Sequence, residues 1–391
     1  MSIQPFEVKI PESTLEDLRA RLVSTRPVPH DWATDWDAGT SPTYLRDLTA
    51  YWSTQYDWRE QEARINRFAQ FRATLDGTAV HFIHERGKGD APLPIVLTHG
   101  YPDSFLRFLK LIPLLTDPGR HGADPRDAFH VVVPSLPGTA FSDNIGKAGT
   151  IFDVGNLWHR LMTEELGYER FGAHGGDWGS TVTEHLARSH SASIVGTHLT
   201  DVPFWHALQK PDDLSPAEET YLGENQRFQT QEGAYAMIQG TRPQTLADGL
   251  NDSPAGLAAW LVEKFQRLSD CDGDVERRFT KDEMLTNVMI YWATETIGSS
   301  FLPYYDLMHA GAATWIIEKA NEWVGSSKVP TGFALFPKEF SHPPREWAQR
   351  FFNVQRWTKM PRGGHFTAME EPELLAEDIR AFFRPVRQVS S

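Results

Sequence analysis

The feature that most constrains this chain is residues 172–180, which read Gly-Ala-His-Gly-Gly-Asp-Trp-Gly-Ser. Small residues around one reactive side chain, between a strand ending at Phe171 and a helix continuing through Thr181, are typical of a nucleophile elbow. In serine hydrolases the reactive residue of such a turn is Ser, but here it is Asp177. We expect the helix N-terminus to favour the ionised form of Asp177. A carboxylate can attack an activated carbon and form an ester. The alternative is that Asp177 only caps the helix.

The composition excludes several classes of function. The 391-residue chain has a net charge of −14, and its Lys and Arg residues are scattered, so neither nucleic acid nor an anionic membrane surface is an expected partner. The single cysteine, Cys271, excludes an internal disulfide framework and a cysteine-based metal cluster. We see neither a secretory signal nor a run of 18 apolar residues. We therefore expect a soluble, cytoplasmic protein without a membrane anchor.

Apolar runs alternate with helical patterns in two parts of the chain, which predicts an α/β fold with a mainly parallel sheet. Besides the strand before the elbow, the predicted strands are 94–98, 129–134, 194–200, 329–336 and 355–360. The helices predicted in these parts are 105–115, 155–166, 344–352 and 372–383. Residues 204–312 contain no convincing strand, and a helical insertion here predicts a lid over the strand ends.

The first 90 residues differ from the rest in composition. A helix opening at Pro11 carries Leu15, Leu18 and Leu22 at helical spacing, and a second helix is expected near 42–55. The many aromatic residues here favour a segment that docks onto another domain. Alternating residues around Asp76-Gly77 predict a hairpin. We divide the chain into an N-terminal meander with the first hairpin, a first core part, the lid and a second core part, at 1–90, 91–203, 204–312 and 313–391.

An ester on Asp177 must be hydrolysed, which requires a base to activate water. His365 lies on a glycine-flanked loop between a predicted strand and helix, and we expect it to be that base. Glu339, just past the 329–336 strand, is the expected carboxylate that orients the imidazole, and Asp201 is a rival. The order nucleophile, acid, histidine is that of α/β-hydrolases.

The oxyanion formed during ester hydrolysis needs preorganised N–H donors. We expect the backbone N–H of Trp178, directly after the nucleophile, and that of Tyr101, in the loop after the 94–98 strand, to form this oxyanion hole.

Taken together, these motifs resemble the epoxide hydrolases of the α/β-hydrolase superfamily, especially the microsomal and juvenile-hormone type with an N-terminal meander. The matching segments are 99–102, 175–179, 250–260, 285–292, 329–332, 336–339 and 362–366. The resemblance covers essentially the whole chain. It implies an α/β-hydrolase fold with a mainly parallel sheet, a helical lid inserted in the sheet and an N-terminal helical meander.

The resemblance also implies that two lid tyrosines hold the epoxide oxygen. By position they are Tyr235 and Tyr304, with the adjacent Tyr305 as an alternative to Tyr304. A phenol O–H can stabilise the alkoxide that forms when the ring opens. The chain departs from the family at Tyr101, where Trp is more usual. Many microsomal members begin with a membrane anchor, and we expect none here.

We therefore expect an epoxide hydrolase that converts a small apolar epoxide to a vicinal diol without a metal or organic cofactor. The alternatives are a hydrolytic dehalogenase of the haloalkane type and a catalytically silent ligand-binding protein on the same fold. The acidic stretch 270–274 resembles the start of a calcium loop, but Lys281 occupies the position of the final Glu ligand. A role in detoxification and one in biosynthesis both fit the chemistry, and a homodimer is compatible with the sequence.

Overall fold

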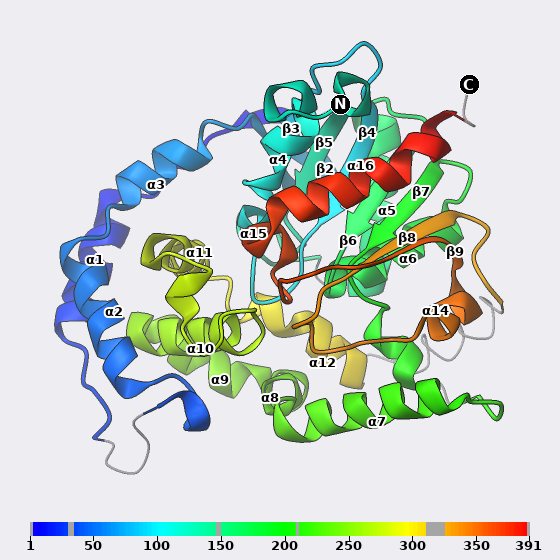
Figure 1. Ribbon diagram of the computed structural model, residues 1–391. Coiled ribbons are helices and arrows are strands. Elements are labelled where there is room, and N and C mark those ends of the chain that lie inside the picture. The colour runs from blue at the N-terminus through cyan, green and yellow to red at the C-terminus, as the bar shows by residue number, and fades with distance from the viewer. Residues whose placement is uncertain (1–2, 30–34, 146–149, 209–210, 310–324, 389–391) are drawn as a thin grey trace.

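The computed structural model describes residues 3–29, 35–145, 150–208, 211–309 and 325–388, and its centre is a nine-stranded sheet of order β1-β2-β3-β5-β4-β6-β7-β8-β9 (Figure 1). Pairings from β1 to β5 are antiparallel, and those from β5 onward through β4 to β9 are parallel. The strands are β1 (Gln4–Phe6), β2 (Gln70–Leu75), β3 (Thr78–Glu85), β4 (Leu93–Thr98), β5 (Phe129–Pro134), β6 (Phe171–Gly175), β7 (Ile194–Leu199), β8 (Pro330–Leu335) and β9 (Asn353–Lys359). The predicted α/β fold with a mainly parallel sheet is confirmed.

Helices cover both faces of the parallel strands, which is why these strands are almost continuously buried. Helix α16 (Pro372–Gln388) packs on β7 and β8, and beside it α4 (Leu111–Thr116) packs on β5. Helix α6 (Trp178–Ser189) packs on β4 and β6 beside α5 (Val154–Arg160). The two layers lie on opposite faces, since Gly172 of β6 faces Phe383 of α16 whereas Gly175 faces Thr183 of α6. Two shorter helices, α14 (Arg345–Phe351) and α15 (Thr367–Glu370), precede and follow β9 in the chain.

The predicted lid follows β7 and precedes β8 in the chain, and its described part consists of helices joined by loops, without a strand (Figure 1). It contains η8 (Phe204–Leu208), α7 (Pro216–Gln231), α8 (Ala234–Thr241), α9 (Pro243–Asp252), α10 (Pro254–Arg267), η9 (Val275–Arg277), α11 (Lys281–Thr294), η10 (Ser299–Phe301) and α12 (Leu302–His309). Capping boxes at Ser215 and Thr280 fix the starts of α7 and α11. The proposed lid boundary at 312/313 lies outside the described residues.

The meander helices α1 (Glu12–Val23), α2 (Pro42–Thr54) and α3 (Trp58–Ile65) wrap around the outer side of the lid (Figure 1). The Tyr51 hydroxyl donates to Asp282 Oδ1 at 2.8 Å, and the Tyr56 hydroxyl lies 3.0 Å from Thr286 Oγ1. Both partners belong to α11. The aromatic-rich segment therefore docks as expected, and its partner is the lid. No described helix combines the length and the apolar composition that crossing a bilayer requires.

Several local predictions were wrong. The predicted helix 105–115 divides into η2 (Phe105–Phe108) and α4, and α5 continues as a π-helical segment at Leu161–Glu165. The elbow strand does not end at Phe171 but begins there, so the first glycines of the motif belong to β6. In contrast, the hairpin predicted around Asp76-Gly77 is confirmed as β2–β3, which joins the main sheet, whereas the short β1 and α3 were not predicted. These features depend on tertiary pairing, which local periodicity does not report.

Docking of α1 predicts a position-dependent loss of stability. Leu18 is 5% exposed in the core, whereas Val23 on the same helix is 81% exposed. We expect Leu18→Ala to lower the free energy of unfolding by roughly 2–5 kcal/mol because it leaves a cavity. The matched variant Val23→Ala should change it by less than about 0.5 kcal/mol. Urea denaturation measures both, and equal losses would contradict the docked position of α1.

Candidate active site

The nucleophile elbow is a strained turn at the carboxyl end of β6. Asp177 has φ 57° and ψ −131°, a conformation that costs a non-glycine residue of order 1–3 kcal/mol. Its backbone N–H donates to Asp201 Oδ1 at 3.2 Å, and Ser180 Oγ donates to Asp201 Oδ2 at 3.0 Å. Asp201 follows β7, the neighbouring strand. The buried carboxylate of Asp201 therefore holds the turn that presents Asp177.

Two glycines allow the surrounding loops to approach the elbow. A Cβ on Gly179 would overlap the carbonyl oxygen of Thr98 at the end of β4. A Cβ on Gly100 would overlap the carboxyl group of Asp177 itself. The loop after β4 can therefore reach the nucleophile only because these positions carry no side chain.

The predicted base and acid are in direct contact. His365 Nδ1 lies 2.9 and 3.1 Å from the two carboxylate oxygens of Glu339. On the other side of the ring, His365 Nε2 lies 3.6 Å from Asp177 Oδ2 and has no hydrogen-bond partner among the described residues. Asp177, His365 and Glu339 thus form a line, with the free ring nitrogen facing the nucleophile.

The charges in this line shift one another's pKa values. Burial by itself would lower the pKa of His365, but the carboxylates of Glu339 and Asp177 outweigh it and raise the pKa to about 9. Burial opposes ionisation of Glu339, yet the charge and hydrogen bond of His365 and the N–H of Phe340 hold its pKa below the ordinary value. The resting histidine is therefore protonated at neutral pH and paired with an ionised Glu339.

The expected effect of the helix N-terminus on Asp177 is only partly correct. Burial raises the pKa of Asp177 above the ordinary value. The His365 charge and the backbone N–H groups of Trp178 and Tyr101 lower it, but by less. Desolvation thus exceeds the stabilisation by the backbone dipoles.

Both residues expected to form the oxyanion hole contact the Asp177 carboxyl group. The Tyr101 N–H donates to Asp177 Oδ1 at 2.9 Å, and the backbone N–H of Trp178 is a further hydrogen-bond donor that lowers the pKa of this group. Oδ1 of Asp177 therefore accepts the Tyr101 N–H, while Oδ2 faces His365.

The structure separates the two candidates for the second lid tyrosine. Tyr304 is 7% exposed, with its ring centroid 5.1 Å from that of Trp178 and 6.0 Å from that of Tyr235. Tyr305 is 37% exposed and stacks on His309. Burial raises the pKa of both Tyr235 and Tyr304, and the nearby Asp177 charge raises it further. Tyr235 and Tyr304 therefore belong to the ring cluster around Tyr101 and Trp178, whereas Tyr305 packs on His309.

The Tyr101 phenol has a contact that the sequence did not predict. Its hydroxyl oxygen accepts hydrogen bonds from Gln239 Nε2 at 2.7 Å and Trp260 Nε1 at 2.8 Å. Gln239 lies on α8 and Trp260 on α10, so one side chain joins the oxyanion loop to two lid helices. The only signal in the sequence was Tyr at a position where Trp is more usual.

Asp201, the rival acid, makes no hydrogen bond to His365 in the described part of the chain. Burial raises its pKa to about 8, and the neighbouring carboxylates of Glu339 and Asp177 contribute to the increase. Its contacts with the elbow backbone make it a support for the nucleophile.

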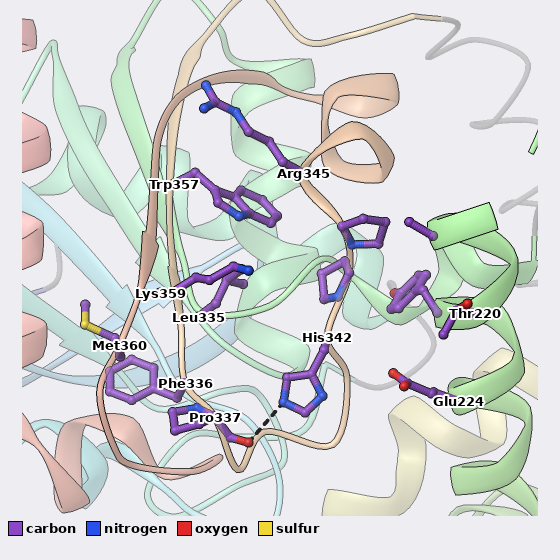
Figure 2. Close-up of a pocket in the computed structure, with 14 residues that line it drawn as sticks. Thr220, Glu224, Leu335, Phe336, Pro337, His342, Arg345, Trp357, Lys359 and Met360 are labelled. Carbon is purple, nitrogen blue, oxygen red and sulfur yellow. Dashed lines mark hydrogen bonds between the residues drawn. The ribbon is translucent and has the colours of Figure 1, made fainter. Parts of the chain in front are cut away.

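A separate pocket of about 740 Å³ lies outside this site, between α7 and the carboxyl ends of β8 and β9. Figure 2 shows Trp357, Lys359 and Arg345 on one side and Thr220 and Glu224 on the other. None of the predicted site residues lines it. Among the described residues, no three His, Cys, Asp or Glu side chains are grouped in a way that could hold a metal ion.

Comparisons with known proteins show what the chain as a whole is similar to. Residues 3–108 match the model of the epoxide hydrolase N terminus, and residues 94–283 match that of the alpha/beta hydrolase fold. The chain is 43% identical over 387 residues to a Stigmatella aurantiaca protein with a provisional epoxide hydrolase name, covering 98% of this chain and 86% of that protein. It is 34% identical to epoxide hydrolase 1 of Sus scrofa, covering 99% of this chain and 90% of that protein.

The chain is also similar to a solved structure along its whole length. The juvenile hormone epoxide hydrolase of the silkworm Bombyx mori superposes with a TM-score of 0.87 at 27% identity, covering 100% of this chain and 96% of that one.

The contact between Glu339 and His365 predicts a pH dependence. We expect Glu339→Gln to lower the His365 pKa from about 9, since it removes the carboxylate that raises it. In the wild type the folded-state pKa exceeds the ordinary value of 6.5, so the stability due to protonated His365 is full below that pH and is lost as pH rises through about 9. Histidine NMR titration, with His365→Gln to assign the signal, measures the pKa. An unchanged pKa in Glu339→Gln would contradict the assigned cause.

Proposed function

The chain belongs to the epoxide hydrolase family of the α/β-hydrolase fold and is an epoxide hydrolase, and we propose that it works through a covalent ester on Asp177. The observation that carries the proposal is that the two carboxyl oxygens of Asp177 have different neighbours. Oδ1 accepts the Tyr101 N–H at 2.9 Å, and Oδ2 lies 3.6 Å from His365 Nε2. A carboxylate held in this way has one oxygen for attack and one in an oxyanion hole.

In the first step, Asp177 Oδ2 attacks one epoxide carbon, and the bond from that carbon to the ring oxygen breaks. Tyr235 and Tyr304 hold the ring oxygen, and one of them donates its proton to the alkoxide as it forms. The product is a hydroxyalkyl ester of Asp177. The tyrosinate left behind recovers a proton from solvent, and His365 loses its own proton to solvent before the second step. The proximity of the two phenols to each other and to Asp177 supports this assignment.

In the second step, neutral His365 takes a proton from water, and the hydroxide attacks the ester carbonyl carbon of Asp177. The negative charge passes to Oδ1, where the N–H groups of Tyr101 and Trp178 stabilise it. The tetrahedral intermediate expels the diol oxygen, which takes the proton from His365, and the resulting Asp177 carboxylic acid gives its proton to His365, so that the resting charges are restored. The sum is one epoxide and one water converted to one vicinal diol.

The change of charge at Asp177 connects the two steps. In the resting enzyme the Asp177 carboxylate helps to raise the pKa of His365. Esterification removes that negative charge, so the pKa of His365 falls and the neutral base becomes accessible at lower pH. The base is therefore activated only after the nucleophile has reacted.

We propose a small apolar epoxide as substrate. The rings around the reacting atoms belong to Tyr101, Trp178, Tyr235, Phe301 and Tyr304, and they offer few polar groups besides the phenol hydroxyls. The family assignment argues against a dehalogenase, as do the paired phenols, since a halide leaves without needing a proton.

Removing the base should trap the ester. We expect His365→Gln incubated with styrene oxide to gain the full mass of the epoxide on Asp177, because alkylation proceeds and hydrolysis does not. Intact-protein mass spectrometry with peptide mapping measures this. The matched variant His342→Gln, whose ring lies in the separate pocket of Figure 2 and contacts Pro337, should turn over like the wild type without an adduct. An alkyl adduct from a haloalkane alone would indicate a dehalogenase, and no adduct from either probe would contradict the covalent route.

Each lid phenol should affect ring opening. We expect Tyr235→Phe and Tyr304→Phe each to slow ester formation by roughly 10- to 1,000-fold, since the alkoxide loses a proton donor. Tyr305→Phe is the matched control and should leave the rate within about twofold, because its ring is exposed and stacks on His309. Rapid-quench measurement of ester formation compares the three. Equal effects at positions 304 and 305 would exclude Tyr304 from this role.

A further inference from the structure

Arg107 is a buried charge that the proposed chemistry does not use directly. Its side chain is 2% exposed and pairs with Asp103, which is 1% exposed. Arg107 Nη1 donates to Asp103 Oδ2 at 2.5 Å, and Nη2 donates to the backbone carbonyl of His365 at 2.6 Å. One guanidinium therefore joins the loop after β4 to the loop that carries the base.

These two loops are far apart in the sheet. Strands β6, β7 and β8 lie between β4 and β9. The Arg107 guanidinium that connects them lies close to the elbow, since a Cβ on Gly176 would lie 3.3 Å from Arg107 Nη2. The side chain thus passes beside the nucleophile turn on its way from one loop to the other.

The same ion pair reaches the oxyanion hole. Asp103 Oδ1 accepts the backbone N–H of Gly100 at 3.1 Å, next to the Tyr101 N–H that contacts Asp177. Asp103 therefore fixes the oxyanion loop, and Arg107 fixes His365 relative to that loop. A planar guanidinium can bond to two partners at once, whereas the ammonium of Lys is a single point charge.

We propose that Arg107 is a positioning residue that sets the place of His365 relative to the Asp177 ester, and that it acts chiefly in ester hydrolysis. A buried ion pair contributes little net stability compared with an apolar pair. Stability alone therefore does not explain why Arg107 and Asp103 occupy these buried positions. A displaced base would reach the attacking water poorly, and a displacement of about 1 Å can cost a hundredfold in rate. Ester formation depends less on His365, because His365 neither donates nor accepts a proton in that step. The inference rests on the proposed covalent route.

Two variants test this role. Arg107→Lys keeps the charge but loses the bridge between Asp103 and His365. The double variant Asp103→Leu/Arg107→Met removes the whole pair and leaves no unpaired buried charge. In both, we expect the ratio of the ester hydrolysis rate to the ester formation rate to fall by roughly 10- to 100-fold, so that the ester accumulates during turnover.

The chain offers a closely matched control. Arg188 is 6% exposed, pairs with the fully buried Glu184 at 2.8 Å, and donates through Nη2 to the backbone carbonyl of Phe351 at 2.7 Å. Arg188→Lys should reduce stability without changing the ratio of the two rates. Single-turnover rapid quench with styrene oxide, read by intact mass, measures both rates.

The outcomes separate this inference from the proposed function. A lower ratio in the Arg107 variants, with an unchanged ratio in Arg188→Lys, supports the positioning role. If both rates fall in proportion, as a purely structural role requires, the role of Arg107 is overturned while the covalent route stands. If His365→Gln forms no ester, the proposed function fails and the role of Arg107 falls with it.

Discussion

The hydrogen bond from the Asp177 N–H to the buried carboxyl group of Asp201 is the interaction on which the active site depends. Asp177 adopts a left-handed conformation that is unfavourable for a residue with a side chain. The strain persists because β6, β7 and α6 enclose the turn and Asp201 binds its backbone. With the turn held, the carboxyl group of Asp177 projects beyond the sheet edge, where the loops after β4, β8 and β9 meet it. All these loops follow carboxyl ends of parallel strands, where such folds place their ligands.

Charge balance is the second constraint on the site. Asp103, Asp201 and Glu339 are three buried carboxyl groups, and they form one cluster with the partly buried Asp177, faced by His365 and Arg107. A buried carboxylate is costly unless it is paired. Arg107 pairs with Asp103 and His365 with Glu339, while the high pKa of Asp201, about 8, keeps that group mostly protonated at neutral pH. This distribution leaves Asp177 as the acid whose charge is consumed by the reaction.

Tyr101 connects this cluster with the periphery of the molecule. Its N–H contacts the nucleophile, and its hydroxyl accepts hydrogen bonds from lid helices α8 and α10. Helix α10 in turn packs against α1 and α2 of the meander. The meander is therefore connected to the site through the lid, since it supports α10, whose Trp260 holds Tyr101. A layered arrangement of this kind explains why an N-terminal segment far from Asp177 belongs to the family pattern.

The sequence by itself determined the family, the α/β class, most strands and helices, and the residues that meet at the sheet edge, because these follow from local periodicity, glycine-bounded turns and the chain order of Asp177, Glu339 and His365. The tertiary structure decided which neighbours each buried group has. It separated Tyr304 from Tyr305 by exposure, turned Asp201 into a support of the elbow, and placed Arg107 against a carbonyl 258 residues later in the chain. It also broke the helix expected at 105–115 and added β1 to the sheet. These outcomes depend on contacts between distant segments, which leave no periodic signal in the sequence.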